Sequence, residues 1–593
     1  MCYVAHYFGP AVGRPWLTSW IGLAAPAASH VCITMIKKIT ALMLLVSTAL
    51  SAETLPDSHM MRDMSMGESR RALQDSTREV NQLIEQRRYQ QLKQQRLLAE
   101  PEPAAPALPQ SAQCLPIAGV YLQGITLLSP ADLSALSALP ENCISSNDIN
   151  RLTRELTRLY VQKGYITARV QIVRPNSQGE LGLSVTEGFI EKIEGGDRWV
   201  NSRLLFPGLE GKPLKLTELD QGLDQANRLQ SNTTKLDILP GRQVGGSVIR
   251  LRNQHAKPWL ITAGTDNYGQ KSTGQWLARA TATLDSPFGL SDFVSLNANS
   301  TLENPAHRYN RAYTLLYSLP YGAFTFSGFA SFSSYENHQQ LPHNLVKLHG
   351  QTQQYGLRSD YVFYRDHDQI DSLSGQLTYK RIDNYFESVR LEVSSPTLTL
   401  AELSASHLQI LPHGVFSANL SVEHGLPWLG ADRHPSSVHL DSQFTKGKLF
   451  ANLSQRLKLG DATYQLNNLF YGQYSRDPLP GVEWLSLTDR SAVRGFSRST
   501  QSGDNGWYLQ NTLSRSFNLG AATLTPRLGA DVGRILPRQD NSGWRSSAGV
   551  SSGATLRYRQ ALVDLEVSRG LILSNHATPE DPVQVLARFS YTF

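Results

Sequence analysis

Beyond its N-terminal region, the sequence lacks any long hydrophobic run. The chain has 593 residues and a mean hydropathy of −0.30. No stretch of about 18 apolar residues, the length that a membrane-spanning helix needs, follows the first part of the chain. The sequence therefore argues against a bundle of membrane-spanning helices. A transmembrane β-barrel remains compatible with it, because about half of the strand residues in such a barrel are polar and face the lumen.

Cysteine is scarce, with four residues in the whole chain. Cys2 and Cys32 precede the region where a signal peptide would be removed, which leaves Cys114 and Cys143 in the exported chain. Two thiols are too few for a structural zinc site, and we predict no metal site. In an exported protein the pair favours one disulfide, although two buried free thiols would also fit the sequence.

Signatures of catalysis are also missing. The chain has no His-Glu-x-x-His pair and no Gly-x-Ser-x-Gly elbow. Residues 264–272 approach the pattern of a phosphate-binding loop, but the spacing is one residue too long and the segment falls in a predicted hairpin. A net charge of +6 on 593 residues is too mild to indicate nucleic-acid binding. We therefore expect no enzyme activity, no cofactor and no nucleic-acid partner.

The N-terminal region contains an export signal that does not begin at residue 1. Residues 35–52 (MIKKITALMLLVSTALSA) combine a basic start at Lys37 and Lys38, an apolar core and small residues that permit cleavage. Residues 1–34 show no such pattern, so we interpret them as an upstream extension and Met35 as the true start. One long, unconventional signal peptide is the alternative.

Residues 68–98 predict a helix, because Gln, Arg, Glu and Leu dominate and glycine and proline are absent. Its thin apolar stripe consists of Leu73, Val80, Leu83 and Ile84. Such a stripe cannot bury much surface in a dry core, so the helix either lies in a wet lumen, stays mobile or forms a solvated surface helix. Residues 99–112, which include EPEPAAPALPQ, predict a stiff, extended tether after the helix.

Residues 113–188 and 189–257 predict two copies of one small β-α-α-β-β domain. In the first copy, residues 146–162 predict an amphipathic helix capped at Ser146 and ended by Gly164. Its inward face comprises Ile149, Leu152, Leu156, Leu159 and Tyr160. The second copy repeats the same order of elements, which indicates an internal repeat of a whole domain.

From residue 258 to 593 the pattern consists of strands alone. Apolar and polar side chains alternate at residues 276–284, 294–298, 324–332, 416–422 and 524–532. The last strand presents Val585, Ala587, Phe589, Tyr591 and Phe593 on one face, and a strand ending on a C-terminal aromatic residue is typical of outer-membrane barrels. A soluble sandwich also alternates, but its strands are shorter. The length allows a barrel of about 16 antiparallel strands whose apolar exterior contacts lipid.

Several strings together resemble one known family. These are LTRLYVQKGYITARV, ANRLQSNTTKLDILPGRQVGGSVI, DNYGQKSTG, LDSPFGLSD, AVRGFSRS and GADVGR. Their order along the chain is similar to that of the transporters of two-partner secretion, the haemolysin secretion/activation (TpsB) family, which is related to the BamA-like insertases. The resemblance implies that the two small domains are POTRA domains and that the β-barrel is a membrane protein of the outer membrane, with the POTRA domains in the periplasm.

The resemblance also implies site residues. The sixth loop would fold back into the barrel as a lid with the motif Val493, Arg494, Gly495 and Phe496, and Arg494 would pair with Asp531 in a wall motif that also contains Gly533. Two unrelated polar groups lining the channel are the alternative to this pair. The residues Phe589, Tyr591 and Phe593 would form the C-terminal assembly signal for the barrel-assembly machinery.

We therefore interpret the chain as a monomeric translocator. Its POTRA domains would bind a large, unfolded TpsA-type exoprotein by β-augmentation, and the barrel would export it without ATP while the helix at 68–98 plugs the resting pore. An outer-membrane insertase, a passive porin and a barrel lipase are the alternatives. The porin has no use for two periplasmic domains, and the lipase lacks an identifiable Ser/His pair.

Overall fold

The structure is a computed structural model. It describes residues 58–96, 113–140, 143–303, 308–340, 345–366, 368–432, 441–497, 501–538, 543–574 and 581–593. The proposed upstream extension, the signal peptide and the tether at 99–112 lie outside the described residues. None of the helices in the described ranges is both long and apolar enough to cross a bilayer.

The first small domain has the predicted β-α-α-β-β order. Its elements are β1 (Gly119–Gln123), α3 (Pro130–Ser134), α4 (Ser146–Gln162), β2 (Arg169–Val173) and β3 (Glu180–Thr186). The sheet order is β1-β3-β2, with β1 parallel and β2 antiparallel to the central strand.

Helix α4 is capped by Ser145, so the predicted cap at Ser146 is wrong. The Ser145 backbone N–H donates to Asp148 Oδ2 at 3.0 Å, and the Asp148 N–H donates to Ser145 Oγ at 3.4 Å. This reciprocal capping box requires an acidic residue three positions after the cap, a spacing that only Ser145 satisfies here. Hydrogen bonds from the Ser145 side chain and backbone lower the pKa of Asp148. The predicted inward residues Ile149, Leu152, Leu156 and Tyr160 are buried, and Leu159 packs against them half-buried.

Two cross-links tie the edges of this domain together. Cys114 and Cys143 form a disulfide with a Cα–Cα distance of 5.3 Å. Glu187, after β3, accepts hydrogen bonds from the backbone N–H of Leu127 at 2.8 Å and from the Tyr160 hydroxyl at 2.6 Å. Burial alone would raise the pKa of Glu187, but these bonds and those from Thr126 outweigh it and lower that pKa. The carboxylate therefore stays ionised and fixes the loop after β1 to helix α4.

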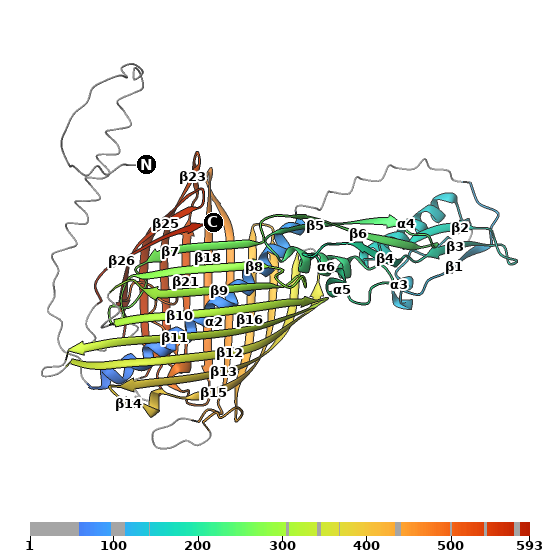
Figure 1. Cartoon of the computed structure of the whole chain (residues 1–593). Coiled ribbons are helices and arrows are strands. Elements are labelled where there is room, and N and C mark those ends of the chain that lie inside the picture. The colour runs from blue at the N-terminus through green and yellow to red at the C-terminus, as the bar shows by residue number, and fades with distance from the viewer. Residues whose placement is uncertain are drawn as a thin grey trace, which may run out of the picture. The chain divides into compact units, whose positions relative to one another are not determined.

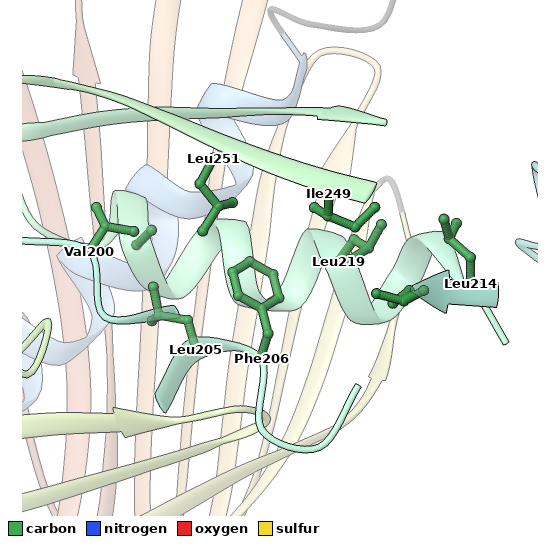
Figure 2. Packing of buried hydrophobic residues seen from close by; sticks show 9 residues of the cluster. Val200, Leu205, Phe206, Leu214, Leu219, Ile249 and Leu251 are labelled. Atoms are coloured by element: carbon green, nitrogen blue, oxygen red, sulfur yellow. The ribbon is translucent and has the colours of Figure 1, made fainter. Parts of the chain in front are cut away.

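The second small domain repeats the order and has its own core. Its elements are β4 (Phe189–Gly195), α5 (Ser202–Leu205), α6 (Leu216–Asn227), β5 (Asn232–Pro240) and β6 (Gly246–His255), with the sheet order β4-β6-β5. Figure 2 shows this core, in which Val200, Leu205, Phe206, Leu214, Leu219, Ile249 and Leu251 converge. A Cβ atom on Gly222 of α6 would lie 2.2 Å from the Phe206 ring, so the helix approaches the ring closely only because this position has no side chain.

The rest of the chain forms a closed antiparallel barrel of 16 strands, which confirms the predicted fold class (Figure 1). The strands are β7 (Trp259–Asp266), β8 (Leu277–Asp285), β9 (Phe293–Thr301), β10 (Arg308–Tyr321), β11 (Phe324–Gln340), β12 (Leu345–Arg365), β13 (Gln369–Phe386), β15 (Thr397–Leu411), β16 (Gly414–Leu426), β17 (Thr445–Leu459), β18 (Ala462–Ser475), β21 (Asn505–Ser514), β23 (Ala522–Leu536), β24 (Arg545–Tyr558), β25 (Ala561–Ile572) and β26 (Gln584–Thr592). Short strands β14 (Val389–Arg390) and β22 (Phe517–Leu519) extend the sheet at its rims. Strand β26 pairs with β7 and closes the barrel.

The two faces of the barrel wall differ as the alternation predicts. Exposed apolar side chains cover the outside, among them Leu296, Phe326, Phe332, Leu420, Leu528, Val585, Phe589, Tyr591 and Phe593. Buried polar side chains face the inside, among them Thr314, Ser318, Ser327, Gln354, Thr378 and Ser406. A wall that is apolar outside and polar inside is stable only in lipid, with a hydrated or polar filling.

The disulfide gives a direct test of how the first small domain is stabilised. We expect Cys114→Ser combined with Cys143→Ser to destabilise residues 113–188 by about 3–4 kcal/mol, because the bond constrains the unfolded chain. Pulse proteolysis of the purified protein across a urea series would measure the change. A reducing agent should shift the parent protein to the same midpoint and leave the double variant unaffected. An unchanged midpoint would contradict the structural role of the bond.

Candidate functional site: the barrel lumen and its occupants

A long helix occupies the lumen of the barrel. Helix α2 spans Ser58–Arg96 and runs through the closed sheet (Figure 1). It begins well before residue 68, where the sequence predicted its start. At 1.5 Å per residue its 39 residues extend over roughly 58 Å, which exceeds the hydrocarbon thickness of about 30 Å. The helix, which lies inside the barrel, is therefore long enough to obstruct its whole length.

Short polar side chains join the helix to the barrel wall. Ser69 Oγ donates to Asn384 Oδ1 of β13 at 2.9 Å, and Gln354 Nε2 of β12 donates to Thr77 Oγ1 at 3.4 Å. The hydroxyls of Ser76 and Ser331 also form a hydrogen bond, which connects the helix to β11. Each such bond contributes a net of about 1 kcal/mol, since water competes for the same groups. The wall thus holds the helix by many weak contacts that hydration can replace.

The apolar stripe of the helix divides between two separate clusters. Leu73 packs with Ile382, Leu398, Leu400, Phe444, Leu479 and Val482, which come from the wall and from the loop between β18 and β21. Val80, with Leu83 and Ile84, packs with Leu229, Phe293, Leu316 and Phe329. Leu229 follows α6 of the second small domain, so this cluster joins that domain, the wall and the helix.

The loop between β18 and β21, residues 476–504 and here called loop six, also enters the lumen. The Arg494 guanidinium donates from Nε to Asp531 Oδ2 at 2.7 Å and from Nη2 to Asp531 Oδ1 at 2.6 Å. The Arg494 backbone N–H donates to the same carboxylate at 3.1 Å. Asp531 lies on β23, and its side chain is only 1% exposed. This two-pronged, charge-assisted geometry fixes both the position and the orientation of the loop tip.

Three glycines in adjacent strands make room for that tip. A Cβ atom on Gly529 of β23 would lie 2.5 Å from Arg494 Nη2, and one on Gly549 of β24 would lie 2.2 Å from the Arg494 carbonyl oxygen. A Cβ atom on Gly570 of β25 would lie 2.5 Å from the Phe496 ring. Sequence reasoning assigned no role to these glycines, although Gly529 begins the string GADVGR. Their signal is present, because glycine inside a strand often marks the close approach of another backbone.

The remaining residues of the two motifs support the same arrangement. Val493 is fully buried in a cluster with Leu485, Leu487, Ala492, Tyr508 and Ile535. Gly495 has a φ of 95°, a conformation that favours glycine, and its carbonyl accepts from the Gly570 N–H at 2.9 Å. Gly533 lies against Leu487 of loop six, where a Cβ atom would approach to 2.4 Å. The structure therefore brings Val493, Arg494, Gly495, Phe496, Asp531 and Gly533 together around loop six.

Helix α2 and loop six also contact each other directly. Arg70 Nη1 donates to the Gly481 carbonyl at 3.0 Å, and Gln74 Nε2 donates to the Trp484 carbonyl at 2.9 Å. Arg71 and Arg78 continue the contact toward the loop tip, where Arg71 Nε lies 3.6 Å from Asp489 Oδ2 and Arg78 Nη2 donates to Ser491 Oγ at 2.5 Å. Sequence reasoning missed these pairs, since arginines on a polar helix have no local sign of their partners. The other predicted residues lie elsewhere, Cys114 and Cys143 in the first small domain and Phe589, Tyr591 and Phe593 on the barrel exterior.

The architecture and the lumen agree with known proteins. The family model for the haemolysin secretion/activation proteins ShlB/FhaC/HecB matches residues 245–556. The chain belongs to this family. A ShlB-type POTRA model matches residues 115–188 and a second POTRA model matches residues 189–240, so the two small domains are POTRA1 and POTRA2. The chain is an outer-membrane translocator of the two-partner secretion type, with its POTRA domains in the periplasm.

The relatives cover most of the chain. The hemolysin transporter protein ShlB of Serratia marcescens is 96% identical over 559 residues, which is 94% of this chain and 100% of the relative. The hemolysin transporter protein HpmB of Proteus mirabilis is 57% identical and covers 89% of this chain and 95% of its own length. Among solved structures, CdiB from Escherichia coli superimposes with a TM-score of 0.76 at 26% identity and covers 91% of this chain and 100% of its own.

The contact between Arg494 and Asp531 can be tested on the loop tip itself. Breaking a buried pair costs about 3–5 kcal/mol in a dry interior and less in a hydrated lumen. We expect Arg494→Ala to raise the rate at which a thiol reagent labels a Ser497→Cys reporter, because the tip is no longer fixed to β23. Arg494→Lys should recover only part of the effect, since an ammonium cannot bind both carboxylate oxygens in the same plane.

A cycle of variants separates the pair from general damage. Asp531→Ala should raise labelling as much as Arg494→Ala, and the combined variant should be no worse than either. Arg490→Ala, which removes an arginine of loop six that stacks on Tyr268 instead, serves as the control. Additive effects of the two alanine variants would show that the residues act separately.

Proposed function

We propose that this translocator exports a haemolysin-type exoprotein, which its POTRA domains capture unfolded in the periplasm. One observation carries the proposal. The lumen contains a polar helix in place of a packed core. Hydrogen bonds to the barrel wall hold this helix, and water or a passing polypeptide can replace them. The names of the two curated relatives mentioned above, both hemolysin transporters, support this class of cargo.

The sheet of POTRA1 offers an edge for an extended cargo segment. Strand β2 lies at the end of the order β1-β3-β2, so its outer side has no hydrogen-bonded strand within the described residues. Ile172 on this strand is 56% exposed beside the exposed polar side chains of Arg169 and Gln171. Backbone hydrogen bonds to β2 would supply affinity for an unfolded chain, and the side chains next to it would supply selectivity.

In this proposal helix α2 is the plug of the resting pore, and loop six is a lid inside the same pore. The tether at 99–112 would let the helix leave the lumen while staying attached to POTRA1. ATP is absent from the periplasm, so export must run downhill. Folding of the exoprotein outside the cell, coupled to threading in one direction, supplies that drive.

Assembly follows from the barrel exterior. Phe589, Tyr591 and Phe593 point outward at the end of β26, where the barrel-assembly machinery would recognise them and where outer-membrane lipid would later cover them. The barrel closes within one chain, which favours a monomer. An insertase and a porin are less favoured alternatives, because the curated relatives named above are transporters and a porin needs no POTRA domains.

If POTRA1 captures the cargo, variants of this domain should lose secretion and keep barrel assembly. We expect deletion of residues 113–188, which form POTRA1, to abolish secretion of a co-expressed haemolysin-type exoprotein, because the cargo loses its edge strand. Immunoblots of medium and periplasm would measure the exported and retained protein. A matched variant with Ile172→Lys should reduce secretion and leave barrel assembly intact, as judged by heat-dependent mobility in detergent gels. Normal secretion by both variants would exclude POTRA1 from capture.

The plug predicts the opposite pattern. We expect deletion of residues 58–96 to raise the ion conductance of the purified protein in planar lipid bilayers several-fold, because the deletion empties the lumen. Secretion of the exoprotein should persist, since the helix must leave the pore in any case. A conductance equal to that of the parent protein would contradict a plug.

A further inference from the structure

Loop six carries a buried acidic residue far from its tip. Glu483 lies in the short helix η2 (Gly481–Glu483). Its carboxylate contacts Lys380 Nζ of β13 at 2.6 Å and Lys446 Nζ of β17 at 2.5 Å. The side chains of Glu483, Lys380 and Lys446 are 4%, 10% and 5% exposed. One carboxylate is thus held between two ammonium groups from two different strands of the wall.

The same charges continue along the inner wall in alternating order. Lys446 Nζ lies 2.9 Å from Glu423 Oε1 of β16, and Lys448 Nζ of β17 lies 3.0 Å from Glu423 Oε2 and 2.8 Å from Glu402 Oε2 of β15. Three lysines and three glutamates therefore form one chain of contacts, which we call the charge ladder. Glu483 is its one member that does not belong to a barrel strand. The ladder is neutral only while loop six supplies that carboxylate.

The segment around Glu483 is also where helix α2 contacts loop six. The carbonyls of Gly481 and Trp484 accept hydrogen bonds from Arg70 and Gln74, and Leu479 and Val482 pack against Leu73. We call residues 479–484 the seat segment. A Cβ atom on Gly481 would lie 2.2 Å from Met66 Sδ, so the Met66 side chain of the helix packs directly on the backbone of the seat segment at this glycine. Trp484 Nε1 donates to the Leu479 carbonyl at 2.9 Å and closes the segment on itself.

We propose that Glu483 is a positioning residue that fixes the seat segment to the barrel wall and thereby retains helix α2 in the lumen. It acts through the seat segment, whose carbonyls and apolar side chains hold the helix. Loop six is then attached at two separate places, at its root by Glu483 to β13 and β17 and at its tip by Arg494 to β23. The root attachment governs the helix, and the tip attachment governs the lid. This inference rests on the proposed role of α2 as the plug.

The test compares two glutamates of the charge ladder. Glu483→Gln removes the carboxylate that anchors the seat segment, whereas Glu402→Gln removes an equally charged group that contacts Lys448 at the other end of the ladder and does not touch loop six in the described contacts. We expect Glu483→Gln to raise the conductance in planar bilayers several-fold, toward that of the protein lacking residues 58–96. Glu402→Gln should stay near the parent value. Labelling of the Ser497→Cys reporter should stay near the parent rate in Glu483→Gln, because the tip remains attached.

A second variant covers a failure of Glu483→Gln to assemble. Gln74→Ala removes the hydrogen bond from helix α2 to the Trp484 carbonyl of the seat segment and leaves the wall unchanged. This variant should raise the conductance as well. Equal conductance of Glu483→Gln and Glu402→Gln would overturn the inference, and so would a parent-like conductance of Gln74→Ala. The deletion of residues 58–96 distinguishes a failure of the proposed plug from a failure of the role of Glu483. If the deletion itself leaves conductance unchanged, the plug is wrong. If the deletion opens the pore and the point variants do not, only the role of Glu483 is wrong.

Discussion

The structure depends on one constraint, that a sheet in lipid must pair every backbone N–H and C=O group within itself. A barrel closed by β26 and β7 satisfies this demand, and an open edge would not. Closure forces alternate side chains into an interior that lipid cannot fill. The inner face here is therefore polar, and whatever occupies the lumen has to be held by hydrogen bonds and ion pairs, with apolar packing confined to a few places.

This constraint explains why loop six is attached by charges and shaped by glycines. A polar lumen offers little hydrophobic stabilisation, so a loop is fixed there by directional contacts such as those between Arg494 and Asp531. Directional contacts need close approach, and Gly529 and Gly549 permit it by omitting side chains where the loop backbone meets the wall. Burial lowers the screening of these charges and gives a definite geometry, whereas an exposed pair would contribute little.

Much of this organisation could be predicted from the sequence, and the reason is local periodicity. A two-residue alternation reports which face of a strand meets lipid, so the barrel and its exterior, including Phe589 and Tyr591, were predicted correctly. The order of elements in the POTRA domains was also predictable, because helices and strands each have their own local periodicity. The cap of α4 was misplaced by one residue, because Ser145 and Ser146 look alike until the carboxylate of Asp148 is considered.

Contacts between distant segments could not be predicted in this way. Arg494 and Asp531 were paired only through the family resemblance, and nothing near Glu483 in the sequence indicates that Lys380 and Lys446 will meet it. Sequence spacing carries no information about which strands of a barrel face each other across the lumen. The contacts of helix α2 could not be predicted either, since a polar helix is compatible with solvent, with a wet lumen or with another surface.

The attachment of the helix has to satisfy two opposing demands. As the proposed plug, the helix must resist thermal motion in the resting state, and it must yield when an exported chain arrives. Two small, separate apolar clusters meet both demands, because one can be lost while the other still holds the helix. The clusters differ in which parts of the protein contact the helix. Leu73 contacts loop six and the wall, whereas Val80 contacts Leu229, which follows α6 in POTRA2. In the proposed function, a cargo that displaces POTRA2 would therefore weaken the cluster around Val80 while the seat segment still holds the helix, and release would begin at the end where the cargo enters.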